Sequence, residues 1–280
     1  MNRAHTIAFV GASGGAGVSC LLAATALRLA ESGLRVACLD RDPCGGGLDV
    51  VFGLDHVRGV RWPEVAGARG ELDPATLLAE LPHDRGIWVL SHGRDSLVVV
   101  SPEADATVLA ALAGGVDVVL IDAGRPTPVT QAQQRGVAVV GLGGTGPVDL
   151  PCVAGADDVV LVVDASPQSL AAASAIAQVA SGADTAATWW LAQRVSRSSA
   201  HLPETVSAAL ELPLAAVVAH DSKCAGALLD GVVPGRRGPL AKAAAQIVQA
   251  LSQQAQQPHQ RRQPSHQSRA RHVLASRRAA

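Results

Sequence analysis

The feature that most constrains this chain is a regular alternation between short apolar runs and longer stretches of helical character. Runs rich in Val, Ile and Leu occur at His5–Val10, Leu34–Leu39, Val116–Ile121, Asp158–Val163 and Ala215–Ala219. Strands that are buried on both faces of a parallel sheet have this nearly continuous apolar pattern. The alternation therefore predicts an α/β fold, a doubly wound and mostly parallel sheet with helices on both faces, in a single domain.

The charge of the chain divides it into two parts. Up to Asp230 there are 14 basic and 24 acidic side chains, whereas from Gly231 onward there are nine basic side chains and no acidic one. A last helix is predicted over Pro239–Gln253, and the Gln-, Arg- and Ser-rich residues that follow show no periodicity. We therefore expect a domain over residues 1–253 and a disordered basic tail over 254–280. Two roles of the tail stay open, weak contact with an anionic membrane and simple solvation.

Two residue types are scarce enough to exclude some chemistry. The chain has no tyrosine, and its two lysines are Lys223 and Lys242, so a tyrosine proton donor and an N-terminal phosphate-binding lysine are both excluded. The first residues do not form a signal peptide, and no run of 18 apolar residues occurs. We therefore expect a cytoplasmic protein.

A glycine-rich turn lies between the first predicted strand and the first predicted helix, Val18–Ser32. Four of the seven residues in Gly11–Gly17 are glycines, and a turn of this kind can bind a phosphate through its backbone N–H groups. One interpretation is a dinucleotide site, because the turn resembles the GxxxGxG motif of short-chain dehydrogenases and Asp40 could bind a ribose. That family uses a tyrosine as its proton donor, so here only dinucleotide binding without dehydrogenase activity would be left.

A second interpretation rests on a different resemblance. Ser13–Ser19 resembles the deviant Walker A motif K-G-G-x-G-K-[ST] of the MinD/ParA ATPases, with both lysines replaced, by Ser13 and Val18. Asp40-Arg-Asp42 resembles the D-x-D segment of that family, and Val118–Asp122 resembles its Walker B strand. Further along, Leu212–Gly231 is similar to the late segment that carries the family's nucleotide-base loop, so the resemblance covers about residues 5–252.

This resemblance implies a P-loop NTPase fold and ATP or ADP with Mg²⁺ as the ligand. The residues that it assigns to the nucleotide are Gly14, Gly15, Ala16, Gly17, Val18, Ser19 and Cys20. It implies Mg²⁺ contacts from Ser19, Asp40 and Asp122, and it gives Asp42 the orientation of the attacking water in an active enzyme. Each of these carboxylates can also simply end a strand at a turn.

The missing lysines leave the activity open. Loss of one electrostatic donor typically costs about 2.7–4 kcal/mol of transition-state stabilisation, so losing two predicts weak or absent hydrolysis. The alternative is an active Mg-ATPase in which Arg41 and Arg125 replace the lysines.

A closer resemblance lies in the middle of the chain. Gly59–Val65, Ala68–Leu72 and Gly86–Ser91 are similar to segments of the actinobacterial septum site-determining group, which is CpaE/TadZ-like. This implies a regulator of septum-site or pilus and secretion assembly, peripheral at a septum or pole, that acts through protein partners and as a homodimer, with no specific nucleic acid.

Other conspicuous residues are given structural roles. His92 and His220 follow apparent strands and are expected to be surface or loop histidines, because no nucleophile or metal partner stands at a useful spacing. Trp189 and Trp190 are adjacent in a predicted strand and are expected to pack on opposite sides of it.

Overall fold

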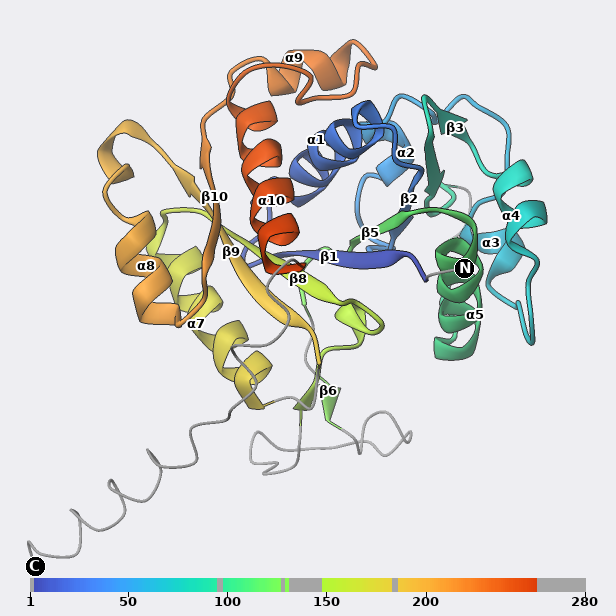
Figure 1. Ribbon diagram of the computed structural model, residues 1–280, viewed down its shortest axis with the longest axis horizontal. Coiled ribbons are helices and arrows are strands. Elements are labelled where there is room, and N and C mark those ends of the chain that lie inside the picture. The colour runs from blue at the N-terminus through green and yellow to red at the C-terminus, as the bar shows by residue number, and fades with distance from the viewer. Residues whose placement is uncertain (1–2, 95–97, 127–128, 131–147, 183–185, 256–280) are drawn as a thin grey trace, which may run out of the picture.

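The computed structural model describes residues 3–94, 98–126, 129–130, 148–182 and 186–255. Their centre is an eight-stranded sheet with the strand order β10-β9-β8-β1-β5-β2-β4-β3 (Figure 1). All its pairings are parallel except that of β3 with β4. The strands are β1 (His5–Gly11), β2 (Val36–Asp40), β3 (His83–Asp84), β4 (Ile87–Leu90), β5 (Val118–Asp122), β8 (Asp158–Val163), β9 (Thr188–Val195) and β10 (Leu214–Ala219).

Helices follow most of the parallel strands, as the alternating pattern predicts. The helices predicted over Val18–Ser32 and Pro239–Gln253 begin at the predicted residues and end within two residues of the predicted ends. The described helices are α1 (Val18–Glu31), α2 (Leu48–Val51), α3 (Trp62–Val65), α4 (Pro74–Glu80), α5 (Pro102–Gly115), α7 (Pro167–Gly182), α8 (Pro203–Leu210), α9 (Cys224–Leu229) and α10 (Pro239–Ala255), with 3-10 turns at Pro151–Val153 and Arg197–Ser199.

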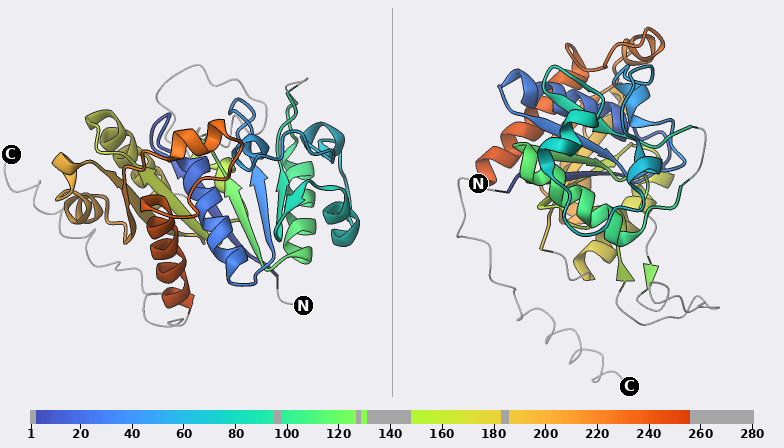
Figure 2. Two further views of the ribbon diagram at one scale, coloured as in Figure 1. Left: turned by 90° about the horizontal axis from the view of Figure 1, so that it is seen from above. Right: turned by 90° about the vertical axis from the view of Figure 1, so that its right-hand side faces the viewer.

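Helices cover both faces of the sheet (Figure 2). Because successive strand residues point to opposite faces, Ile7 and Phe9 join one core with α1 and α10, while Ala8 and Val10 join the other with α4, α5 and α7. Trp190 belongs to the first core and Trp189 to the second, as expected. This two-sided arrangement confirms the predicted α/β class.

The glycine-rich stretch Cys44–Leu72, whose sequence shows no helical or strand periodicity, contains two one-turn helices, α2 and α3. Long-range contacts hold them in place. The carboxylate of Asp49 in α2 is fully buried and accepts hydrogen bonds from Arg61 Nε at 3.0 Å and from Arg94 Nη2 at 2.9 Å. The indole N–H of Trp62 in α3 donates to the carbonyl of Asp40. Local sequence did not reveal these helices because their stabilising partners are distant in the chain.

A separate antiparallel ribbon joins β6 (Val129–Thr130) to β7 (Val148–Asp149). In the chain between these two strands, the apolar run Val137–Gly141 predicts a further strand and is followed by a glycine-rich loop, Gly141–Gly146; both lie outside the described residues. So does the predicted basic tail, except for its first two positions, which continue α10.

The last helix, α10, packs against α1 and β10 through a stripe that includes Leu240, Ile247 and Leu251. Among the described helices, none combines the length and the apolar character that a bilayer crossing requires.

Candidate functional site

The glycine loop lies at the carboxyl edge of the sheet, between β1 and α1. Its start is fixed by two neighbouring strands, because Gly11 N donates to Gly124 O at 2.8 Å and Ala12 N donates to Val162 O at 3.0 Å. Gly15 and Gly17 have φ values of +72° and +85°, a region that side chains with a Cβ rarely adopt. The loop shape therefore depends on glycine at these two positions.

A cavity of about 270 Å³ opens inside the loop. All seven residues assigned to the nucleotide by resemblance, Gly14–Cys20, line it together with Asp42, Asp122 and Arg125. The amino end of the 14-residue helix α1 forms one wall, and the first turn of that helix carries no acidic residue. Backbone N–H groups at such an end attract anions, so the cavity suits a phosphate group.

The two positions that lack lysine are filled by neutral side chains with structural contacts. The Ser13 hydroxyl lies within hydrogen-bond distance of Asp164 Oδ2, at 2.9 Å, and of Ser169 Oγ, at 3.1 Å. Val18 is buried in the core beneath the loop. Neither position provides a positive charge to the cavity.

Ser19 and Asp122 meet at the floor of the cavity. The Ser19 hydroxyl donates to the carboxylate of Asp122, which also accepts from Gly124 N at 3.1 Å. Asp122 is buried, and its pKa is raised to about 6, chiefly by burial, with a further contribution from the carboxylates of Asp40 and Asp42 and against the opposing effect of its hydrogen bonds. A hydroxyl and a carboxylate side by side provide the oxygen donors that Mg²⁺ prefers.

Asp40 has a different environment, although it is the register partner of Asp122 across β2 and β5. Its carboxylate accepts from Asp42 N at 3.0 Å, from Leu48 N at 2.9 Å and from Ser91 Oγ at 2.8 Å. Burial raises the pKa of Asp40, and these hydrogen bonds oppose the shift. Asp40 lines the larger hollow that adjoins the loop cavity but not the loop cavity itself, although its carboxylate is close enough to Asp122 to raise the pKa of that residue.

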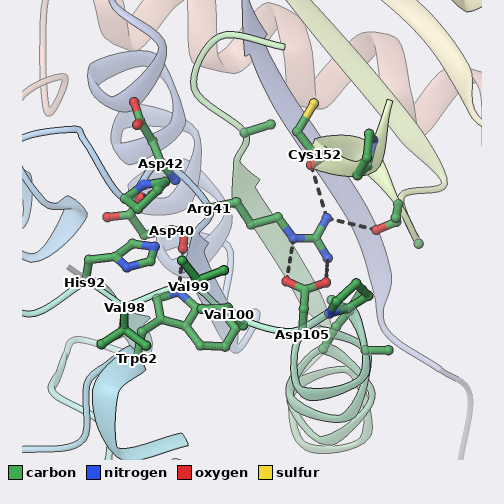
Figure 3. Close-up of a pocket in the computed structure, with 18 of the residues that line it drawn as sticks. Asp40, Arg41, Asp42, Trp62, His92, Val98, Val99, Val100, Asp105 and Cys152 are labelled. Atoms are coloured by element: carbon green, nitrogen blue, oxygen red, sulfur yellow. Dashed lines mark hydrogen bonds and ion pairs between the residues drawn. The ribbon is translucent and has the colours of Figure 1, made fainter. Parts of the chain in front are cut away.

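Arg41 points away from the loop, toward α5 (Figure 3). Its guanidinium pairs with both oxygens of Asp105, at 2.7 and 2.8 Å, and donates to the carbonyls of Cys152 and Ala154. The side chain is 7% exposed. The expectation that Arg41 replaces a lost lysine is therefore wrong for this arrangement, because its donors are taken by protein groups.

Asp42 and Arg125 do lie at the cavity. The Asp42 carboxylate lies so close to Gly124 that a Cβ there would come within 2.8 Å of Oδ2. Arg125 is exposed and makes no ion pair with a described residue. Of the two arginines considered from the sequence, only Arg125 is free to face a ligand.

A larger hollow of about 1610 Å³ continues from the loop along α5. Its lining includes Asp42 and Arg125, which also line the loop cavity, together with Trp62 and His92. Figure 3 shows Trp62 and His92 side by side. His92, expected to be a surface or loop histidine, is 9% exposed, and burial lowers its pKa against the opposing effect of Asp40 and Asp42. Its ring lies 6.0 Å from that of Trp62. His220 is exposed, as expected.

Sequence reasoning did not assign a site role to Arg194, which the structure places against the loop. The residue lies near the carboxyl end of β9, and its Nη1 donates to Gly15 O at 2.9 Å. The available signal was its position after a predicted strand, since the carboxyl ends of parallel strands meet at one edge of a sheet.

Comparison with known sequences gives matches over less than half of the chain. No family model matches the chain. An uncharacterized protein of Mycobacterium tuberculosis is 37% identical over 126 residues, which are 45% of this chain and 35% of that protein. The match thus spans about a third of the length of this curated relative.

Solved structures match over nearly the whole chain. A ParA family ATPase from Chlorobium tepidum superposes with a TM-score of 0.70 at 19% identity, covering 90% of this chain and 99% of that one. MinD of Pyrococcus horikoshii in complex with Mg-ADP gives 0.66 at 20% identity, covering 90% and 97%. The MinC:MinD complex of Aquifex aeolicus gives 0.68 at 18% identity, covering 89% and 96%. The chain therefore has the P-loop fold of the MinD and ParA ATPases.

Proposed function

We propose that this protein binds ATP or ADP with Mg²⁺ at the glycine loop, hydrolyses ATP slowly or not at all, and uses the bound nucleotide to control its association with protein partners. The observation that carries the proposal is the Ser19–Asp122 pair on the floor of a loop cavity of about 270 Å³. Its fold, which is that of the MinD and ParA ATPases, and a structure of MinD with Mg-ADP support the choice of ligand.

The residues at the cavity fit a magnesium ion that arrives with a nucleotide. Ser19 and Asp122 would each contribute one oxygen ligand, while no cluster of three or more His, Cys, Asp or Glu side chains suited to a metal occurs in the described part of the chain. Mg²⁺ commonly takes one or two protein oxygens and completes its shell with phosphates and water. When bound, the ion neutralises charge between the phosphates. Asp40 acts indirectly, since its hydrogen bonds fix the loop that carries Asp42.

Hydrolysis is expected to be slow because charge stabilisation is missing. Neither Ser13 nor Val18 can replace a lysine at the phosphates, and Arg41 is paired with Asp105. Asp42 lines the cavity and can accept a hydrogen bond from an attacking water, while Arg125 is the cation that lines both hollows. An active Mg-ATPase that relies on Arg125 is the second candidate function, favoured by this position.

Titration calorimetry and a phosphate-release assay test these candidates on the purified chain. We expect micromolar binding of Mg-ADP and Mg-ATP, no binding of NAD or NADP, and turnover close to background. Turnover well above background that Asp42→Ala abolishes would establish the ATPase instead. Tight binding of NAD or NADP without ATP binding would support the dinucleotide interpretation, and binding of none of these ligands would leave a scaffold without nucleotide.

The cellular role is proposed by resemblance to the septum site-determining group. We propose a localisation regulator for septum-site or pilus and secretion assembly, cytoplasmic or peripheral at a septum or pole; the MinC:MinD complex is one case of a partner bound to this fold. A nucleotide-dependent homodimer is the simplest form of such a switch. Light scattering with and without Mg-ATP tests it, and an unchanged mass with saturating nucleotide would contradict it.

A further inference from the structure

The phosphate loop has a positive charge on its β9 side. Arg194 Nη1 donates to Gly15 O at 2.9 Å, and the same nitrogen lies 3.9 Å from where a Cβ on Gly17 would stand. Both glycines line the loop cavity. The guanidinium therefore lies within a few ångströms of backbone that surrounds the space for a phosphate.

The donors of Arg194 are largely unused in the described structure. A guanidinium has five N–H donors, and the contact with Gly15 is the one hydrogen bond that it donates to a described residue. No described carboxylate lies within 4.0 Å of it. The nearby Asp164 carboxylate accepts hydrogen bonds from the Ser13 hydroxyl and from Ser166 N. Burial acts to raise the pKa of Asp164, but its hydrogen bonds and the charge of Arg194 outweigh burial and lower that pKa. Arg194 thus keeps donors for a ligand.

Charges of both signs surround the cavity. Asp42 and Asp122 line it and suit a metal beside the phosphates. Burial raises the pKa of the Cys20 thiol in the first turn of α1, and the charges of both Asp122 and Arg194 act on it, so the two charged groups lie near the same part of the loop. Ligand pockets usually measure about 300–1,000 Å³, so a nucleotide would extend beyond this cavity of about 270 Å³ while its phosphates stay at the loop.

We propose that Arg194 is a ligand-binding residue that contacts a phosphate which bound nucleoside diphosphates and triphosphates share, and so restores part of the charge lost at Ser13 and Val18. This inference rests on the proposed function and names a residue that the loop motif does not contain. The contact with Gly15 holds the guanidinium in place before the ligand arrives, which reduces the entropy lost on binding.

Three variants of one residue separate charge from loop support. Arg194→Ala removes both, Arg194→Gln keeps a donor for Gly15 without the charge, and Arg194→Lys keeps the charge. Arg28→Ala, on the exposed side of α1, is the matched control. Titration calorimetry of Mg-ADP and Mg-ATP gives the readout, with far-ultraviolet circular dichroism to check folding.

We expect Arg194→Ala and Arg194→Gln to lower the affinity for both nucleotides by about 10- to 100-fold, which is the effect of losing a hydrogen bond to a charged group. Arg194→Lys should recover much of this loss, and Arg28→Ala should bind like the wild type. The inference requires that the variants lose affinity for ADP and for ATP by the same factor, because both nucleotides carry the phosphate that Arg194 contacts.

Two results would overturn the inference while leaving the proposed function intact: wild-type affinity in Arg194→Gln, which would reduce the residue to a support for Gly15, or a loss confined to ATP. A folded wild-type chain that binds neither nucleotide would overturn both. If Arg194→Ala does not fold, the Gln and Lys variants decide. Tighter nucleotide binding by Arg194→Lys than by Arg194→Gln supports the inference, and equal binding by the two contradicts it.

Discussion

The ends of β2 and β5 carry similar residues and use them differently. Asp40 ends β2 and is followed directly by Arg41, while Asp122 ends β5 and Arg125 stands three residues later. The two aspartates are register partners. At β2 both charges are taken up by the protein, by backbone and Ser91 for Asp40 and by Asp105 for Arg41. At β5 both charges border the loop cavity. One strand end supports the architecture, whereas the other is available to a ligand.

Breaking the Arg41–Asp105 pair should have the largest effect. Arg41→Ala leaves a partly buried carboxylate and two carbonyls without their donor, so we expect a loss of about 3–5 kcal/mol in the free energy of unfolding, measured by urea titration. Arg85→Ala is the control, because Arg85 pairs with Asp84 at the surface and should cost less than about 1 kcal/mol. A stable Arg41→Ala chain that has lost Mg-ADP binding would contradict the supporting role.

Asp40→Ala should have the next largest effect. The change removes the acceptor of three hydrogen bonds at a buried position. The Ser91 hydroxyl loses its acceptor, whereas Leu48 N keeps its hydrogen bond to Ser91 Oγ. We expect a loss of about 2–3 kcal/mol in the free energy of unfolding. Urea unfolding at neutral pH measures it. If stability is unchanged and only Mg²⁺ dependence is lost, Asp40 is a metal contact and the contrast between the two strand ends disappears.

Asp122→Asn should act in the opposite direction on stability. Because its pKa is raised to about 6 in the folded chain, Asp122 favours folding fully only below its ordinary pKa of 3.8, and that contribution is lost as the pH rises through about 6. Asparagine does not titrate, so the variant should gain about 1–2 kcal/mol at pH 8 and less at pH 5, while Mg-nucleotide binding is lost. Thermal unfolding at the two pH values provides the measurement. An equal gain in the free energy of unfolding at the two pH values would show that ionisation of the Asp122 carboxylate is not the cause.

Arg125→Ala should change stability least. The side chain is exposed and makes no ion pair with a described residue, so the free energy of unfolding should stay within about 0.5 kcal/mol. Its charge faces the cavity, and we expect Mg-ATP to bind about tenfold more weakly in calorimetry. Unaltered affinity would mean that neither strand end supplies a cation to the site.

The fold was predictable because its signal is local. Continuous apolar runs and proline starts mark most strands and helices, so the first and last helices and the order of the parallel elements follow from the sequence. The one-turn helices α2 and α3 were not predictable, since they depend on Asp49, Arg61 and the contact of Trp62 with Asp40.

The site was predictable only in part, because only some of its residues are neighbours in the sequence. The loop residues Gly14–Cys20 are contiguous, so their gathering at one cavity needs no long-range information. Arg41 and Arg125 look equivalent in sequence, and what separates them is Asp105, 64 residues from Arg41, with two carbonyls still farther along the chain. Arg194 reaches the loop across 179 residues, a distance over which no local pattern carries information.

The indole of Trp62 has a practical consequence. It donates to the carbonyl of Asp40 and borders the hollow that continues from the loop. Because the chain contains no tyrosine, its intrinsic ultraviolet emission arises from its four tryptophans alone. Trp62 is thus a natural optical probe at the end of β2, and a spectral shift on adding a ligand, absent in Trp62→Phe, would report events at this edge of the sheet without any attached dye.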